Sequence, residues 1–236
     1  MQVSVIIPTH NEAQAIERVL AELPSDLTTE VIVVDSNSND GTPEIAARMG
    51  ARVVQEPRRG YGRACLTGLA TANSPDVVAF LDGDYSDRPS ELPILLAPII
   101  EGRADITLGS RLQGRHSGAL PWHQVFGNRL AATLIRLLYG LDISDLGPFR
   151  AGRANVLRAL ALEETTYGWA VEMILKGALA GLDVYKRQHR ATAPTWRASA
   201  GRPRRPKPPD QFLPLPTPAA SAVHLRRADP KPNWTT

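Results

Sequence analysis

The first half of the chain alternates short β-rich segments with helical patterns, and this alternation limits the fold more than any other feature. It is typical of βαβ units and of a mainly parallel sheet flanked by helices. Strands are expected at residues 3–7, 31–34, 52–55, 77–81 and 105–109, and helices at 12–23, 43–49, 62–72 and 89–102. The sequence therefore predicts an α/β fold, in which ligands bind at the carboxyl edge of the strands.

Composition limits the organisation of the chain and its surroundings. The 236 residues are 43% hydrophobic, which is enough for one sizeable core. Cys65 is the only cysteine, so no intramolecular disulfide can form, and we expect a cytoplasmic protein. The N-terminus lacks signal-peptide features, and no stretch reaches the roughly 18 apolar residues of a spanning helix. Any membrane contact is expected to be peripheral, on the cytoplasmic face; a helical pattern over 122–139 fits either core packing or such contact.

Positive charge is concentrated at the C-terminal end of the chain. Residues 186–236 hold 11 Lys and Arg against 2 Asp and Glu, with half of the 20 prolines, whereas residues 1–185 hold 16 against 22. The basic balance thus belongs to the tail, and we expect no nucleic-acid partner for the folded part.

Polar clusters follow the first two expected strands. Pro8, Thr9 and Glu12 come after the first, and Asp35 and Ser36 open an Asn- and Ser-rich segment after the second. The Asp35 carboxylate could accept hydrogen bonds from a nucleobase, while backbone groups near Pro8 could orient the base or ribose. The alternative is that residues 40–43, Asp-Gly-Thr-Pro, form only a turn and a helix N-cap.

The apolar segment 77–81 leads directly into Asp82-Gly83-Asp84. On a regular strand the two carboxylates would point to opposite faces, so Gly83 is expected to let the backbone turn until both approach one ion. Mg²⁺ and Mn²⁺ favour oxygen ligands, and Mg²⁺ often takes one or two carboxylates together with substrate phosphates. The motif therefore predicts a divalent metal, Mg²⁺ or Mn²⁺, held by Asp82 and Asp84 and bridging to a diphosphate.

The order of motifs resembles that of family-2 glycosyltransferases, and within them the dolichyl- or polyprenyl-phosphate mannosyl- and glucosyltransferases. The motifs are Pro-Thr-His-Asn-Glu, Val-Asp-Ser-Asn-Ser-Asn-Asp-Gly-Thr, Arg-Gly-Tyr-Gly-Arg-Ala, Asp-Gly-Asp, Gly-Ser-Arg and Asp-Leu-Gly-Pro-Phe-Arg, within residues 3–184. The resemblance implies a GT-A fold and inverting transfer of a hexose from a nucleotide sugar, of the UDP-glucose or GDP-mannose type, to a polyprenyl or dolichyl phosphate.

The resemblance also assigns roles to residues. Those for nucleotide-sugar binding are Pro8, Thr9, Glu12, Asp35, Ser36, Arg63, Asp82 and Gly83, and the catalytic ones are Asp84, Arg111, Asp145 and Glu172. Ser36 departs from the second Asp that many members carry, which leaves base and ribose selectivity open.

The need for a general base depends on the acceptor. A phosphomonoester is already mostly dianionic at neutral pH and can attack without losing a proton, whereas a sugar hydroxyl cannot do so readily. With a lipid phosphate, Asp145 and Glu172 would organise the site or bind sugar hydroxyls, and Arg111 could neutralise phosphate or form a surface salt bridge. Transfer to a saccharide hydroxyl, and a catalytically impaired nucleotide-sugar-binding module, are the alternatives.

The resemblance ends at residue 184, which divides the chain into a family-2 catalytic domain over 1–184 and a Pro- and Arg-rich tail over 185–236. The tail is either a disordered basic segment attracted to anionic lipid or a non-native continuation, such as a frameshift product. The second is favoured because the break falls inside the expected domain. A sugar-nucleotide nucleotidyltransferase is not favoured, because no Gly-rich motif with a following Lys lies near the first strand. A dinucleotide-dependent oxidoreductase is not favoured either, because Gly60-Tyr61-Gly62 is not a complete Gly-x-Gly-x-x-Gly motif.

Overall fold

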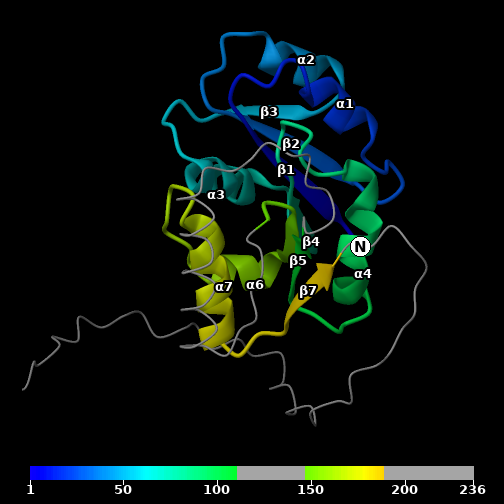
Figure 1. The fold of residues 1–236 in the computed structure, drawn as a ribbon, viewed down its shortest axis with the longest axis vertical. Helices are drawn as coiled ribbons and strands as arrows, with labels where there is room; N and C mark the ends of the chain where they lie inside the picture. Colours follow the sequence, from blue (N-terminus) through cyan, green and yellow to red (C-terminus); the bar gives the residue numbers. More distant parts are fainter. Residues whose placement is uncertain (111–146, 189–236) are drawn as a thin grey trace, which may run out of the picture. The chain divides into compact units, whose positions relative to one another are not determined.

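The structure is a computed structural model that describes residues 1–110 and 147–188 (Figure 1). Both stretches lie within one compact unit, residues 1–197. Arg111, Asp145 and the helical pattern expected over 122–139 lie outside the described residues.

The described residues form a mixed sheet in the strand order β3-β2-β1-β4-β6-β5-β7. The first four strands in this order, β3, β2, β1 and β4, are parallel to one another, and β5 and β7 are also a parallel pair. β6 runs antiparallel to both of its neighbours, β4 and β5. The expected α/β fold with a mainly parallel sheet is confirmed. The strands are β1 Val3–Thr9, β2 Glu30–Asp35, β3 Arg52–Gln55, β4 Val77–Phe80, β5 Ile106–Ser110, β6 Arg150–Arg153 and β7 Val184–Gln188.

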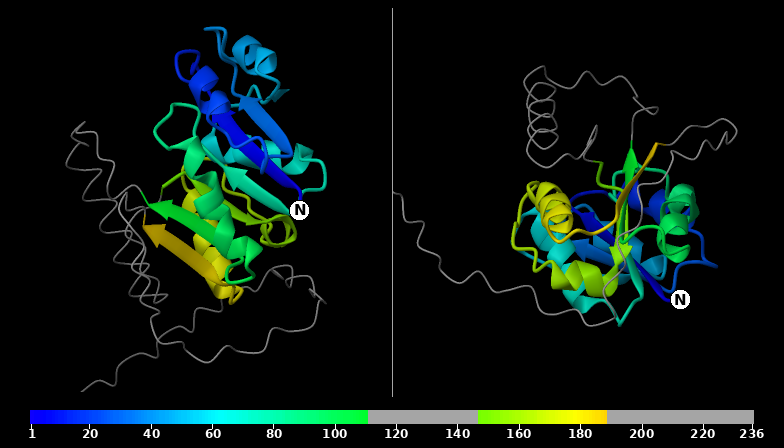
Figure 2. Two further views of the ribbon diagram at one scale, coloured as in Figure 1. Left: turned by 90° about the vertical axis from the view of Figure 1, so that its right-hand side faces the viewer. Right: turned by 90° about the horizontal axis from the view of Figure 1, so that it is seen from below.

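Helices cover both faces of this sheet (Figures 1 and 2). Side chains alternate along a strand, so Ile6 of β1 packs with the core on one face and its neighbours Val5 and Ile7 pack with the core on the other. Burial on both faces explains why the strands read as continuous apolar runs. The face of the sheet to which Ile6 points is covered by α3 Tyr61–Thr71, α6 Ala154–Ala159 and α7 Trp169–Leu179. The opposite face is covered by α1 Ile16–Ala21, α2 Thr42–Arg48 and α4 Leu92–Ile100. A 3-10 turn, η1 Pro89–Glu91, precedes α4.

The first helix begins later than its sequence pattern predicts. Regular helix starts at Ile16 instead of residue 12, and the backbone N–H groups of Glu12 and Ala13 bond to side chains of the segment after β2. Glu12 N donates to Thr42 Oγ1 at 2.8 Å and Ala13 N donates to Asp40 Oδ2 at 3.0 Å. The residues before α1 are therefore bonded to the loop after β2 and to the start of α2.

Among the elements after residue 147, β6, α6 and β7 had no counterpart among the expected strands and helices. β7 continues through residue 188, so the expected domain boundary after residue 184 falls inside a paired strand. None of the helices in the described ranges has the length and apolar character needed to cross a membrane.

Candidate functional site

The carboxyl ends of β1 and β2 bring Thr9 and Asp35 side by side. The two residues are register partners, and the hydroxyl of Thr9 donates to Asp35 Oδ1 at 3.4 Å. Asp35 Oδ2 accepts the backbone N–H of Ser38 at 3.0 Å, and Ser36 N donates to the carbonyl of Thr9 at 2.9 Å. Asp35 is only 1% exposed, so its carboxylate shapes the loop after β2 from a buried position.

The loops after β1 and β2 are joined by side chains. His10 Nδ1 lies 2.9 Å from the carbonyl oxygen of Ser36, and Asn11 N donates to Ser38 Oγ at 2.8 Å. The Asp40 carboxylate accepts the backbone N–H and the hydroxyl of Thr42, and these bonds contribute to lowering the pKa of Asp40. Asp40 therefore stabilises the turn before α2, as the alternative interpretation of residues 40–43 predicts.

The motif Asp82-Gly83-Asp84 follows β4 at the same edge, because Phe80 of β4 is paired with Ile6 of β1. A Cβ added at Gly83 would lie 2.8 Å from Thr9 Cγ2, so glycine is needed for this close approach. The backbone turns at Gly83, as expected, and the left-handed residue of the loop is Tyr85, with φ 61°. Pro8, Thr9 and Gly83 thus meet at one place.

The carboxylates at this edge influence one another. Burial, followed by the negative charges of Asp84 and Asp40, raises the pKa of Glu12. Asp84 is exposed, and its Oδ1 accepts the backbone N–H of Ser86 at 2.8 Å. The carboxylates of Glu12 and Asp84 are therefore near enough to repel each other, and a bound cation would reduce that repulsion.

The donor set fits a divalent metal whose other ligands come from a substrate. Within residues 1–110 and 147–188, no group of three or more His, Cys, Asp or Glu side chains is arranged to hold an ion. Mg²⁺ commonly binds through one or two carboxylates plus waters and phosphates, and the two carboxylates of Asp82 and Asp84 agree with that chemistry.

A buried aromatic and cationic cluster lies beside Asp82. Burial lowers the pKa of Arg150, and the charges of Asp82 and Asp87 oppose that change. The Arg150 guanidinium donates to the carbonyls of Pro148 and Ala170, each at 3.2 Å, and to that of Gly147. Its Cζ lies 5.6 Å from the ring centroid of Trp169, which is fully buried. Arg150 is thus a fully buried cation whose charge is stabilised by the nearby carboxylates of Asp82 and Asp87.

Tyr61 connects this cluster to the start of α3. Burial first, and then charges that include the Asp82 carboxylate, raise the pKa of Tyr61. The Tyr61 ring stacks on Tyr167 at 5.8 Å between centroids and meets Trp169 edge-on at 6.2 Å. Neither Tyr61 nor Trp169 was among the predicted site residues; the tyrosine between two glycines at the start of a helix was the available signal.

The segment that joins β3 to α3 carries a second group that the sequence did not reveal. The buried Glu56 carboxylate binds Arg58 and the hydroxyl of Thr67, and chiefly the Arg58 bond lowers the pKa of Glu56 to about 2. Glu56 N also donates to the carbonyl of Asp35 at 2.9 Å. Arg63 lies in the first turn of α3, where its Nε is buried with no hydrogen-bond partner in the described ranges.

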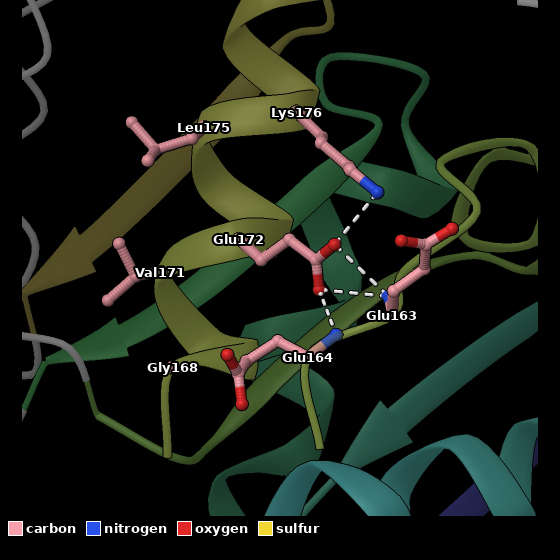
Figure 3. A pocket seen from close by; sticks show the side chains of 7 residues that line it. All are labelled: Glu163, Glu164, Gly168, Val171, Glu172, Leu175 and Lys176. Carbon is pink, nitrogen blue, oxygen red and sulfur yellow. Dashed lines mark hydrogen bonds and ion pairs between the residues drawn. The ribbon is translucent and has the colours of Figure 1, made fainter. Parts of the chain in front are cut away.

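Glu172 points from α7 towards the 163–164 backbone (Figure 3). Its carboxylate accepts Glu163 N at 3.0 Å and Glu164 N at 2.8 Å, and it pairs with Lys176 Nζ at 2.7 Å. An open pocket beside it is lined by Glu163, Glu164, Gly168, Val171, Glu172, Leu175 and Lys176.

Comparisons with known proteins give the family. The Glycosyl transferase family 2 model matches residues 4–161. An uncharacterized glycosyltransferase of Mycobacterium tuberculosis is 36% identical, over 76% of this chain and 80% of its own length. A dolichyl-phosphate hexose transferase of Haloferax volcanii is 34% identical, over 77% of this chain and 78% of its own.

A solved structure of similar fold is glucosyl-3-phosphoglycerate synthase from Mycobacterium tuberculosis, in complex with Mg²⁺ and UDP. It is 28% identical, with a TM-score of 0.65, and the match covers 81% of this chain and 72% of that one. Another structure of the same enzyme holds Mn²⁺, UDP and glucosyl-3-phosphoglycerate. The family match covers well over half of the chain and the fold agrees, so this protein belongs to glycosyltransferase family 2 and has the GT-A fold.

Proposed function

We propose that the chain transfers a hexose, with inversion, from a UDP- or GDP-sugar to a polyprenyl or dolichyl phosphate. The observation that carries the proposal is the convergence of Thr9, Asp35 and Asp82-Gly83-Asp84 at one sheet edge. Relatives named for dolichyl-phosphate and undecaprenyl-phosphate transfer support the acceptor class.

The donor would bind along the carboxyl edge of β1, β2 and β4. Asp35 would recognise the base, and Asp82 and Asp84 would hold Mg²⁺ or Mn²⁺ against the diphosphate. Such a metal supplies positive charge that stabilises the departing nucleoside diphosphate. The metals and UDP seen in the solved relative support this arrangement. The remaining donor-binding residues would be Pro8, Thr9, Glu12, Ser36, Arg63 and Gly83.

Arg111 and Asp145, which lie outside the described residues, would serve the acceptor. A lipid phosphate attacks as a dianion, so the reaction needs positioning and cationic support more than proton removal. A lipid acceptor would also place the protein at the cytoplasmic face of a membrane. A second candidate is a small phosphorylated hydroxyl acceptor, because the solved relative is crystallised with phosphoglyceric acid.

Calorimetry of the full chain with UDP and GDP, with and without Mn²⁺, tests the donor site. Asp84→Ala should abolish the metal-dependent part of binding and leave the circular dichroism spectrum unchanged. Asp26→Ala is the matched control, because Asp26 is an exposed carboxylate on the loop before β2. Equal binding by Asp84→Ala and Asp26→Ala in the presence of Mn²⁺ would contradict the metal site.

Radiolabelled UDP-glucose and GDP-mannose, each with polyprenyl phosphate or 3-phosphoglycerate, test the acceptor. Label that enters the organic phase only with polyprenyl phosphate supports the proposal, and Asp145→Asn should then retain measurable transfer. Label in the water-soluble product instead, lost in Asp145→Asn by about 10²–10⁴-fold, would reject the lipid acceptor and keep the glycosyltransferase.

A further inference from the structure

The Glu172 carboxylate is occupied by protein donors. Its Oε2 accepts Glu164 N at 2.8 Å, its Oε1 accepts Glu163 N at 3.0 Å, and Lys176 Nζ lies 2.7 Å from Oε1 (Figure 3). Lys176 also donates to the carbonyl of Ala161 at 2.6 Å, so both ends of this ion pair hold the same segment of chain. A carboxylate so engaged is a structural acceptor more than a base.

The protonation equilibrium agrees with that role. Burial would raise the pKa of Glu172, but the bonds from Lys176 and from the N–H groups of Glu164 and Glu163 outweigh burial and lower it. A general base works best with a pKa near the operating pH, and Glu172 is shifted away from that range.

The segment that Glu172 holds caps the start of α3. Arg63 N donates to Thr165 O at 3.0 Å and Gly62 N donates to Thr166 O at 3.2 Å. The N-cap residue, Gly60, offers no side chain, so these carbonyls satisfy amides that a Ser or Asp would otherwise cap. The segment from 163 to 166 therefore replaces a helix cap.

Gly60, before α3, and Gly62, within it, leave the space that the 163–166 segment occupies. A Cβ at Gly60 would lie 2.3 Å from Thr165 O, and one at Gly62 would lie 2.4 Å from Glu164 O and 2.6 Å from Trp169 Cβ. Such distances leave no room for any side chain. Gly60-Tyr61-Gly62 is therefore a backbone docking site within the chain, which explains why it is no dinucleotide motif.

Tyr61, between these glycines, contacts the residues that follow the segment. Its ring stacks on Tyr167 and meets Trp169, and the Trp169 ring in turn meets Phe80, the last residue of β4, at 4.8 Å between centroids. Arg63, assigned to the donor site, lies in the turn that the segment caps.

We infer that Glu172 is a positioning residue: by holding residues 163–166 against the start of α3, it fixes Tyr61 and Arg63 for binding of the nucleotide sugar. The inference takes its ligand, the nucleotide sugar, from the proposed function and does not otherwise depend on that function. It assigns Glu172 a place behind the site, where it acts through the 163–166 segment and contacts no reacting atom.

The test compares Glu172→Gln with Glu163→Gln in the full chain. Both remove one carboxylate from neighbouring positions, but the Glu163 side chain is exposed and turns away from the hydrogen bonds drawn in Figure 3. A glutamine at 172 keeps one acceptor oxygen and places an amide donor against backbone donors. Hydrogen exchange should therefore accelerate at least about tenfold at Gly62 and Arg63 in Glu172→Gln alone.

Nucleotide binding supplies the functional readout. The Kd for UDP or GDP with Mn²⁺ should rise about tenfold in Glu172→Gln and stay unchanged in Glu163→Gln. Turnover at saturating donor should fall less than about threefold, with the same pH profile as the wild type. If Glu172→Gln is too unstable to purify, Lys176→Met should give a smaller acceleration of exchange at the same two amides.

Two results would overturn the inference. One is exchange at Gly62 and Arg63 that is the same in Glu172→Gln, or in Lys176→Met, as in Glu163→Gln. The other is unchanged Kd with turnover reduced about 10²–10⁴-fold and a lost pH limb, the signature of a general base. Failure of the wild type to bind UDP and GDP would instead reject the proposed function, and the exchange experiment would still decide the role of Glu172.

Discussion

Arg58 binds the carboxylate of Glu56, two residues before it, through two parallel hydrogen bonds. Arg58 Nε donates to Oε1 at 2.9 Å and Nη2 donates to Oε2 at 3.2 Å. Thr67 of α3 donates to the same carboxylate at 2.9 Å, so Glu56 joins the end of β3 to the helix that follows. The chain between them includes Gly60 and Arg63, which places this pairing next to the candidate donor site.

We expect the Glu56 interactions to make folding stability depend on pH in the acid range. The pKa of Glu56 is lowered from 4.5 to about 2, so its contribution is fully present above about pH 4.5 and is lost as the pH falls towards 2. Glu56→Gln should cost about 1 kcal/mol at neutral pH, since the buried carboxylate loses its charge-assisted bonds to the exposed Arg58 and the half-buried Thr67.

Urea unfolding at several pH values measures this difference. The free energies of unfolding of wild type and Glu56→Gln should converge as the pH falls through that range. Asp26→Asn, which alters an exposed carboxylate, should follow the wild type throughout. A constant difference between Glu56→Gln and wild type from pH 7 to pH 2 would contradict the assignment.

Gly62→Ala should destabilise the protein by more than its helical position implies. In an open helix alanine is favoured over glycine by about 1 kcal/mol, but here the new Cβ would meet Glu164 O at 2.4 Å. We expect a net loss of about 1–3 kcal/mol in thermal or urea unfolding, the usual cost of overpacking. Gly177→Ala in α7 is the matched control, because its nearest heavy atom would be 3.4 Å away, and it should be neutral or stabilising.

Arg150→Met should be among the most damaging single changes in the described core. The variant removes a fully buried cation that faces Asp82 and Asp87 and donates to three backbone carbonyls. Breaking such a buried arrangement typically costs about 3–5 kcal/mol. Urea denaturation should show this loss, whereas Arg48→Met, at an exposed position of α2, should change stability by less than about 0.5 kcal/mol. A loss below about 1 kcal/mol for Arg150→Met would mean that the cation is dispensable.

The sequence by itself determined the elements whose signals are local. The apolar runs gave β1 to β5 to within a residue or two at each end, and Pro43 and Pro89 marked the starts of α2 and η1. It also placed Asp35 and Asp82 at one edge, because parallel neighbouring strands end on the same side. The order of motifs was sufficient to give the family, which the comparison confirmed.

Tertiary structure decided the features that depend on distant partners. β6 is a four-residue strand with the sequence Arg-Ala-Gly-Arg, which has no clear strand pattern. It is a strand because it pairs with β4 and β5 on either side. Gly62 is glycine because residue 164 passes over it, and Glu172 turns towards the 163–164 backbone because the loop before α7 folds back on the helix. Periodicity specifies which residues share a face; packing between segments a hundred residues apart determines which backbone groups they meet.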